Sequence, residues 1–282
     1  MSRRFSQVDV FSEDAFGGNP VAVVHDAQGL DSNAMQRFAA WTNLSETTFL
    51  LPPTRPGVDY RLRIFTPTGE LPFAGHPTLG SAHAWLEAGG RPATEGTLVQ
   101  ECAAGLVRLR SEPLLAFAAP PRVRSGPPTP AERARVLAAL ALGADAVVAM
   151  EWCDNGPGWI GVLLESADAV LAVTPDPAEF GDLDLGLVGP YDDVRAAEVG
   201  AHVEVRALFR ALGVVEDPVT GSLNAALAQW LIGEGRLPDA YVASQGTLLG
   251  RTGRVHVERD GDTIWVGGHT STRIVGGVDL DG

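Results

Sequence analysis

A weak internal repeat constrains the fold of this chain more than any other feature of its sequence. The segment 75–91 reads GHPTLGSAHAWLEAGGR, and the segment 221–236 reads GSLNAALAQWLIGEGR. Allowing a one-residue gap, the two copies share a first glycine, a Trp-Leu pair and a closing Gly-Arg pair. Self-similarity at a long period indicates that one structural unit occurs more than once. We therefore expect two domains built on one plan, each with a helix that begins at Gly75 or at Gly221.

Local patterns predict strands and helices on both sides of the middle of the chain. Apolar runs and alternation predict the strands 5–11, 21–24, 47–51, 60–65, 97–109, 159–165, 202–209, 255–257 and 263–266. Helical spacing predicts a helix over 32–41 with Ser32 as its N-cap, and a second over 130–142. The segment 175–185 reads as an acidic loop, and the five prolines of 120–132 mark the best candidate for a linker.

The size of the chain agrees with two domains. Its 282 residues, 45% of them hydrophobic, are enough for two moderate cores without disulfides or metals. We expect an N-terminal domain of residues 1–118, joined by the C-terminal tail of about 267–282, and a C-terminal domain of residues 119–266.

Charge and cysteine content limit the partners and the compartment. A net charge of −14 argues against nucleic-acid and anionic-membrane partners. No apolar run reaches the length of a membrane span, and the N-terminus lacks the apolar core of a signal peptide. The two cysteines, Cys102 and Cys153, are expected to be reduced structural thiols. The six histidines form no HxxH or HExxH pair, so we expect no bound metal. From the missing signal peptide and membrane span we expect a cytoplasmic protein.

The two repeated helix starts are candidate anion sites. The first turn of a helix has unpaired N–H groups and the positive end of the helix dipole. Glycine at 75 and 221 would let a ligand approach the backbone closely. If the two starts face one cleft, they would together bind a small carboxylate. The alternative is that Gly75 and Gly221 only begin helices.

Three polar residues lie at these helix starts. The dipole at the start of a helix would lower the pKa of His76 and favour a neutral imidazole, which suits proton transfer. Asp217, in EDPVTGS, could orient a substrate amine, and Ser222 follows Gly221. Each has a purely structural alternative, since Asp and Ser are common helix caps and a histidine can cap as well.

Glu46, in NLSETTFLL, stands apart because no other charged residue occurs between Arg37 and Arg55. Apolar neighbours would desolvate its carboxylate and raise its pKa toward the range of a general base. The alternative is a glutamate on a surface turn. The chain has no GxSxG, Walker or GxGxxG pattern, so hydrolase, nucleotidase and dinucleotide-binding functions lack support.

Four motifs in this order resemble the PhzF-like family, which is related to the phenazine-biosynthesis isomerase: VDVFSEDAFGGNPVAVV, NLSETTFLL, RIFTPTGELPFAGHPTLGSAHAWL and GVVEDPVTGSLNAAL. The later segment ASQGTLLGRTGRVHVE is also similar. The resemblance implies an α+β fold of the diaminopimelate-epimerase type. In that fold two similar domains each wrap a curved sheet or barrel around a central helix, and the active site lies in the cleft between the domains.

The resemblance also implies roles for individual residues. Glu46 matches the glutamate of the family's SET-type motif, the base that moves a proton between two carbons of one conjugated system. His76, Asp217 and Ser222 match residues that hold or relay protons on the substrate. The resemblance adds Asn19 and Ser45 as substrate-binding residues. It further implies that backbone N–H groups near Gly75 and Gly221 bind a carboxylate.

Racemases of this fold use two cysteines, one at each helix start, and the corresponding positions here are Ala74 and Thr220. Neither residue can act as a thiolate base, which disfavours a two-thiol racemase. One departure from the family concerns Arg210, which stands where a small residue or proline is usual. A change there could alter the shape of the pocket, so it affects the expected substrate more than the expected mechanism.

The sequence therefore predicts an isomerase that needs no cofactor and moves a proton within a small carboxylate-bearing metabolite. Two alternatives stay open: a racemase or epimerase with a carboxylate base, and a non-catalytic small-molecule-binding protein of the same fold. By family analogy the protein is expected to be a homodimer.

Overall fold

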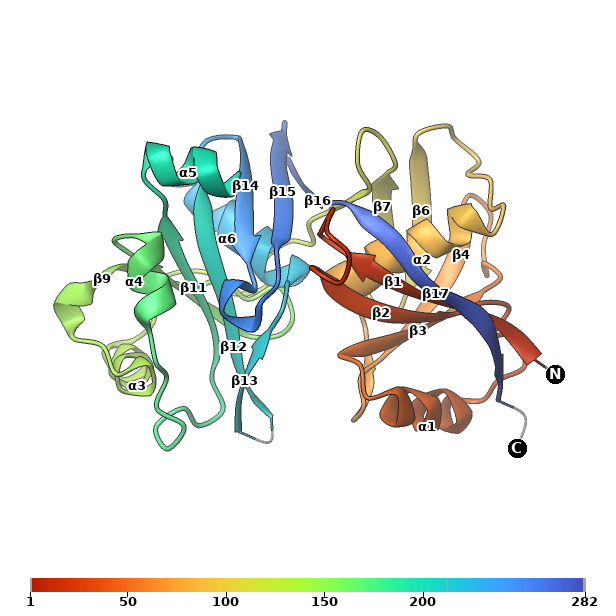
Figure 1. Cartoon of the computed structure of the whole chain (residues 1–282), viewed down its shortest axis with the longest axis horizontal. Helices are drawn as coiled ribbons and strands as arrows, with labels where there is room; N and C mark the ends of the chain where they lie inside the picture. The colour runs from red at the N-terminus through yellow and green to blue at the C-terminus, as the bar shows by residue number, and fades with distance from the viewer. Residues whose placement is uncertain (1, 212, 281–282) are drawn as a thin grey trace. The chain divides into compact units, whose positions relative to one another are not determined.

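The computed structural model describes residues 2–211 and 213–280. The chain divides into two compact units (Figure 1), which are described separately below. Unit 1 is Met1–Ala118 together with Gly267–Gly282, and unit 2 is Ala119–Val266. Among the helices of the described residues, none combines the length and apolar character needed to cross a membrane.

The sheet of unit 1 is built from strands of both ends of the chain. Its spatial order is β17 (Thr270–Asp279), β1 (Ser2–Val10), β2 (Asn19–Val24), β3 (Glu46–Leu51), β4 (Tyr60–Phe65), β6 (Thr97–Cys102), β7 (Gly105–Arg110) and β8 (Ala116–Ala118). The pairs β2–β3 and β4–β6 are parallel, and the other pairs of this order are antiparallel. The short strand β5 (Glu70–Leu71) forms a hairpin with β4.

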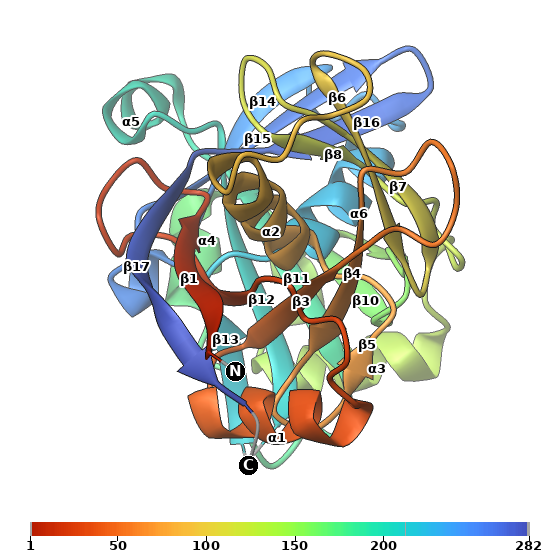
Figure 2. The same ribbon diagram turned by 90° about the vertical axis from the view of Figure 1, so that its right-hand side faces the viewer.

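The sheet of unit 1 curves around the central helix α2 (Gly75–Glu87), as Figure 2 shows. The helix contacts strands from both ends of the sheet order, β17 and β8, as well as β1, β2, β3 and β4. Gly80 lies so close to β2 that a Cβ there would be 2.3 Å from Cγ1 of Val21. The missing side chain therefore lets the helix pack directly on the sheet.

Helix α1 (Ser32–Thr42) covers the opposite face of this sheet, below β3 in Figure 1. Phe38 of α1 packs with ring centroids 6.4 Å from Phe49 of β3, and Phe49 packs edge-on against Phe65. The N-cap of α1 is Asp31, whose carboxylate accepts a hydrogen bond from the Ala34 N–H, so the prediction of Ser32 was wrong by one residue. Asp31 has the extended backbone that an N-cap requires, and Ser32 is already helical.

The sheet of unit 2 has the spatial order β9 (Val147–Trp152), β10 (Trp159–Leu164), β11 (Asp184–Pro190), β12 (Val203–Ala211), β14 (Ala240–Gln245) and β15 (Gly253–Asp260). The pairs β10–β11 and β12–β14 are parallel, and β13 (Gly213–Asp217) forms a hairpin with β12. Strand β16 (Thr263–Gly267) follows β15, and the short 3-10 turns η1 (Ala144–Ala146) and η2 (Thr247–Leu249) lie in loops.

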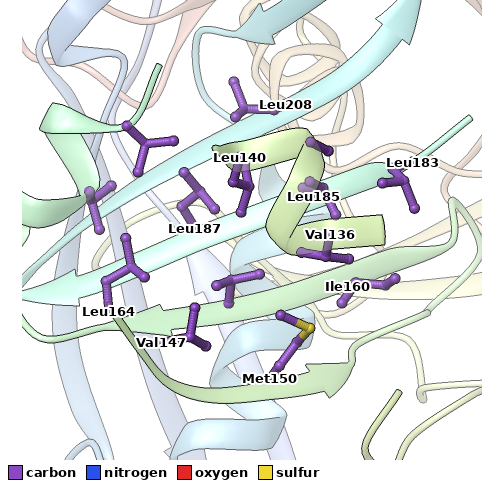
Figure 3. Close-up of a cluster of buried hydrophobic side chains, with 14 of the residues drawn as sticks. Val136, Leu140, Val147, Met150, Ile160, Leu164, Leu183, Leu185, Leu187 and Leu208 are labelled. Carbon is purple, nitrogen blue, oxygen red and sulfur yellow. The ribbon is translucent and has the colours of Figure 1, made fainter. Parts of the chain in front are cut away.

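Unit 2 packs helices on both faces of its sheet. Helix α3 (Pro130–Leu140) and α4 (Ala167–Ala172) belong to an apolar core in which Val136 and Leu140 meet Ile160 and Leu185 (Figure 3). On the other face, a Cβ at Gly186 of β11 would be 2.2 Å from Cδ1 of Leu223 in the central helix α6 (Gly221–Leu231). The third helix of this unit outside the centre is α5 (Asp193–Val199).

Both units follow one connectivity, in which the elements from β1 to β7 correspond in order to those from β9 to β15. In each, the second and third strands are parallel, a hairpin precedes the central helix, and the next strand returns parallel to the fourth. Each of these hairpins also carries an ion pair at the equivalent position. In unit 1 it joins Arg63 and Glu70 at 2.6 Å, and in unit 2 it joins Arg206 and Glu216 at 2.8 Å. The weak repeat of the sequence thus extends well beyond the two helices.

The loop predicted for 175–185 is partly wrong, because β11 begins at Asp184. The sequence patterns also gave no indication of β9, α4 or α5. Helix α3 starts at Pro130 as expected, and a capping box of Thr129 and Glu132 closes its first turn.

Candidate active site

Glu46 is the first residue of β3 and lies on the face of the sheet that covers α2. The hydroxyl of Thr48, two residues further on, accepts a hydrogen bond from Ser81 of α2 at 2.8 Å. Residues two apart in a strand share a face, so the Glu46 side chain leaves the sheet toward the same helix. Its side chain is only 15% exposed, so Glu46 is not the glutamate on a surface turn that the sequence left as the alternative.

The Glu46 carboxyl meets the imidazole of His76 on the first turn of α2. Oε2 of Glu46 lies 3.2 Å from Nε2 of His76, whose side chain is 5% exposed. Burial lowers the pKa of His76 to about 3, and a hydrogen bond with the Pro20 backbone opposes this only in part. The imidazole is therefore neutral at ordinary pH, and the contact is not an ion pair between two full charges. The lowered pKa was expected from the helix dipole, whereas its main cause is burial.

Two further groups contact the ring of His76. Nδ2 of Asn19 is 3.3 Å from Nδ1 of His76. The backbone of Pro20 can only accept from the ring, because proline has no N–H. The ring of the neutral imidazole thus contacts an amide, a carbonyl and the Glu46 carboxyl.

The two central helices begin differently from the outer ones. Asp31, Thr129, Ser166 and Asp192 cap the outer helices α1, α3, α4 and α5 through their side chains. At α2 and α6 the N-cap residues are Ala74 and Thr220, and neither forms such a bond within the described residues. The first N–H groups of both central helices are therefore not covered by a cap and suit an anion.

The remaining predicted residues of unit 1 differ in accessibility. Gly75 is buried as the first residue of α2, and Asn19 is fully buried. Ser45, directly before β3, is exposed. The structure therefore brings Glu46, His76 and Asn19 together, and Ser45 borders this group from the surface.

In unit 2, Asp217 ends β13 and is tied to the N-cap of α6. One of its carboxylate oxygens accepts a hydrogen bond from the Thr220 hydroxyl at 2.5 Å. Gln245 at the end of β14 accepts a hydrogen bond from the Thr220 N–H at 3.0 Å and donates one to the Thr220 hydroxyl at 2.9 Å. Asn224 of α6 donates to Gln245 at 2.8 Å.

Ser222 is the second residue of α6, after the buried Gly221. Its hydroxyl lies 3.3 Å from the indole Nε1 of Trp159, which donates to it, and its carbonyl accepts from Asn155 at 2.9 Å. Ser222 thus takes the place at α6 that His76 takes at α2. Neither Asp217 nor Ser222 caps α6, since its N-cap is Thr220.

The sequence analysis did not predict any role for Thr220 beyond its position, nor for Gln245, Asn224 or Trp159. Gln245 lies in ASQG and Asn224 in SLNAAL, each among small or apolar residues. A glutamine and an asparagine inside otherwise apolar elements are the only signal that could have indicated a buried polar network.

The two thiols lie outside these groups. Cys102 ends β6 and Cys153 is fully buried, and burial raises the pKa of the Cys153 thiol to about 12 and raises that of Cys102 as well. Neither is a thiolate at neutral pH. In the part of the chain that the structure describes, no three His, Cys, Asp or Glu side chains gather as a metal site would require.

A family model described as phenazine biosynthesis-like protein matches residues 8–276 of this chain. The chain belongs to the phenazine biosynthesis-like protein family. A relative from Pseudomonas aeruginosa, named trans-2,3-dihydro-3-hydroxyanthranilate isomerase, is 36% identical over 92% of this chain and 91% of its own length. A relative from Schizosaccharomyces pombe, named antisense-enhancing sequence 1, is 35% identical over 96% and 97%.

Solved structures extend this result to the fold. A phenazine biosynthesis protein of the PhzF family from Enterococcus faecalis is 25% identical, with a TM-score of 0.78, over 99% of this chain and 100% of its own. A hydroxyproline epimerase from Agrobacterium vitis shares the fold with a TM-score of 0.59, at 14% identity over 100% and 93%. These neighbours confirm the family resemblance and the epimerase-like α+β fold. Because relatives along nearly the whole chain are named isomerases, this member of the family is an enzyme of the isomerase class.

Proposed function

We propose that this isomerase moves a proton between two carbons of a small carboxylate-bearing metabolite, without a cofactor, and that Glu46 carries the proton. The observation that supports this most is the 3.2 Å contact between the Glu46 carboxyl and a buried imidazole whose pKa is lowered to about 3. A neutral imidazole can accept a hydrogen bond from the protonated carboxyl or donate one to the carboxylate, whereas an imidazolium can only donate.

The proposed step balances within the substrate. The Glu46 carboxylate removes a proton from one carbon, and the electron pair of that C–H bond forms a new double bond. The electron pair of the existing double bond then takes a proton at the far carbon from the Glu46 carboxyl. Nothing is oxidised or reduced, and the enzyme ends in its starting state. General acid–base help of this kind contributes about 10²- to 10⁴-fold in rate.

We propose that the chain has two domains, 1–118 with 267–282 and 119–266, and that the start of each central helix binds the substrate. The N–H groups at Gly75 and Gly221 would donate hydrogen bonds to a carboxylate of the substrate, which is supported by the missing side-chain caps of both helices. Asp217 and Ser222 would contact the polar groups of the substrate. Asn19, fully buried, would act on the substrate through His76.

The substrate class follows from the relatives and the chemistry together. A proton can leave carbon for a carboxylate base only where the carbanion is conjugated, so we propose an unsaturated carboxylic acid with an amine or hydroxyl. Trans-2,3-dihydro-3-hydroxyanthranilate, named for the Pseudomonas relative, has these features and is the first probe to use.

The test is a panel of unsaturated amino and hydroxy acids, including this probe, incubated with the protein in D₂O and followed by proton NMR. The proposal predicts a shifted double bond, with deuterium at the new C–H only as far as the proton on Glu46 exchanges with D₂O before it is returned. Inversion with deuterium at one stereocentre would indicate an epimerase with a carboxylate base. A compound that binds in a thermal-shift assay but never exchanges would indicate a binding protein.

We also propose a cytoplasmic homodimer that binds no nucleic acid. The family resemblance and the net charge of −14 support these points. Light scattering after size-exclusion chromatography tests the dimer, for which a mass near 59 kDa, about twice the 29.6 kDa of one chain, is expected.

A further inference from the structure

The hydrogen bonds around Gln245 determine the orientation of its side-chain amide. The N–H of Thr220 can only donate, and it lies 3.0 Å from one end of the Gln245 amide, so that end is the oxygen Oε1. The other end is therefore Nε2, a donor, which lies 2.9 Å from the Thr220 hydroxyl and 3.2 Å from the Asp217 carbonyl. Gln245 is fully buried, so no water competes for these contacts.

The neighbours of the Thr220 hydroxyl also determine where its hydrogen points. The hydroxyl accepts from Nε2 of Gln245, and its single hydrogen is then directed to Oδ2 of Asp217, at 2.5 Å. Asn224, 1% exposed, donates to the Gln245 oxygen and to the Thr220 carbonyl and so fixes the amide from the helix side. A continuous chain of donors thus runs from Asn224 through Gln245 and Thr220 to the Asp217 carboxylate.

We propose that Gln245 and Thr220 are positioning residues of the active site, which hold Asp217 in one rotamer and in its charged form by directing a hydrogen bond to Oδ2. This inference rests on the proposed function, in which Asp217 contacts the substrate. A hydrogen bond to the charged form of a carboxylate favours that form, and a buried donor chain cannot reverse without leaving one of its groups unpaired. Thr220 therefore does more than begin a helix.

The test compares Thr220→Val, which removes the hydroxyl at nearly constant shape, with Thr220→Ser, which keeps it. We expect Thr220→Val to lower kcat about 10- to 100-fold with KM changed by less than about 3-fold, as for loss of a hydrogen bond to a charged group. Thr220→Ser should recover kcat to within about 3-fold of the original protein. Gln245→Glu should match Thr220→Val, because the introduced carboxylate cannot donate to the hydroxyl and draws its hydrogen away from Asp217.

Tyr60→Phe is the matched control, since Tyr60 is also buried and its hydroxyl donates to a buried glutamine, Gln100, at 3.1 Å. A similar loss of stability with kcat unchanged is expected there. Equal kcat in Thr220→Val, Thr220→Ser and the original protein would overturn the inference while leaving the proposed function intact. Full activity of Glu46→Gln would instead overturn the proposed function.

Crystal structures of the Thr220 variants provide a test that needs no substrate. The inference predicts that the Asp217 carboxylate turns away or adopts two rotamers in Thr220→Val and keeps its place in Thr220→Ser. An unchanged Asp217 in Thr220→Val would contradict the inference, whatever the activity.

Discussion

The two central helices begin on the same structural plan but carry different chemistry. At the start of α2, a carboxyl touches a neutral imidazole, Glu46 against His76 at 3.2 Å. At the start of α6, the carboxylate of Asp217 accepts from a fixed donor chain that ends at Thr220. Under the proposed function, the first arrangement transfers a proton, whereas the second holds its protons in place. The difference teaches that a duplicated frame can keep its connectivity while the residues at its two helix starts differ.

The comparison extends to the strands that lead to each helix. Glu46 pairs with Val21 as the first residue of β3, and Asp184 pairs with Trp159 as the first residue of β11. Asp184 lies two residues before Gly186, whose missing side chain faces α6, so it shares that face. Burial, and then the charges of Asp182 and Asp154, raise the pKa of Asp184 to about 6. Asp184 is thus the counterpart of Glu46 in unit 2, without a histidine at the equivalent helix position.

The largest effect is expected from removing the two equivalent carboxylates in turn. Glu46→Gln should lower kcat at least about 10³-fold, because the base that moves the proton is lost. Asp184→Asn should change kcat less than about 3-fold, because Ser222 at the facing helix start cannot take part in the same exchange. The kcat of both variants is measured from initial rates with whichever compound of the NMR panel the protein converts. A loss in Asp184→Asn as large as in Glu46→Gln would mean that the two units share the proton transfer.

His76 and Ser222 occupy the same position, the second residue, in the two central helices. His76→Gln should lower kcat about 10²-fold, since an amide beside the Glu46 carboxyl cannot gain and release a proton as an imidazole can. Ser222→Ala should mainly raise KM, by about 3- to 10-fold, because only a neutral contact to the substrate is lost. Steady-state kinetics on purified variants separate kcat from KM. A purely KM effect of His76→Gln would remove the imidazole from the proton transfer.

The third comparison addresses the packing of the central helices. In unit 1 the glycine is on the helix, where a Cβ at Gly80 would lie 2.3 Å from Val21. In unit 2 it is on the strand, where a Cβ at Gly186 would lie 2.2 Å from Leu223. Gly80→Ala and Gly186→Ala should each reduce the free energy of unfolding by about 1–3 kcal/mol through overpacking. Urea unfolding measures this, and an unchanged midpoint in either variant would show that the helix can move away without cost.

The smallest effect is a pH dependence of stability that is specific to unit 2. The pKa of Asp184 is raised to about 6, so the folded protein binds this proton more tightly than the unfolded chain. The contribution of Asp184 to stability is therefore present at low pH and is lost as the pH rises from about 4 to about 6. Asp184→Asn should then be more stable than the original protein at pH 8 by about 1 kcal/mol, reduced from the full linkage value because the group is partly exposed.

Urea unfolding at pH 4.5 and pH 8 measures this linkage in both proteins. Glu198→Gln is a suitable control, since Glu198 is exposed, pairs with Arg195 at 2.9 Å and is not among the charges that raise the pKa of Asp184. A stability difference between the original protein and Asp184→Asn that is the same at both pH values would contradict the raised pKa.

The sequence predicted the duplicated frame and the chemistry of unit 1 better than the chemistry of unit 2. Gly75 and Gly221 indicated the two central helices because the repeat is local and contiguous. The contact of Glu46 with His76 joins residues 30 positions apart, and only the motif resemblance had grouped them. Local periodicity contains no information on which strand end meets which helix start, and that information comes from the sheet order.

The network around Thr220 could not be predicted, for a physical reason. Gln245 acts through four hydrogen bonds to a turn and a helix that precede it by more than 20 residues. Such a role depends on burial and register, which the sequence around Gln245 does not specify. Asp184 was missed for a related reason, because it lies at the end of an acidic segment whose composition predicts a loop.

The central claim is that a neutral imidazole lies beside Glu46, and the ¹⁵N chemical shifts of the His76 ring test it without any substrate. Labelled protein would be measured from pH 5 to pH 9, with His76→Gln to assign the signals. We predict ring shifts of a neutral imidazole over this whole range, because burial lowers the pKa of His76 to about 3. A titration of His76 to the imidazolium with a midpoint between pH 6 and pH 7 would contradict the account.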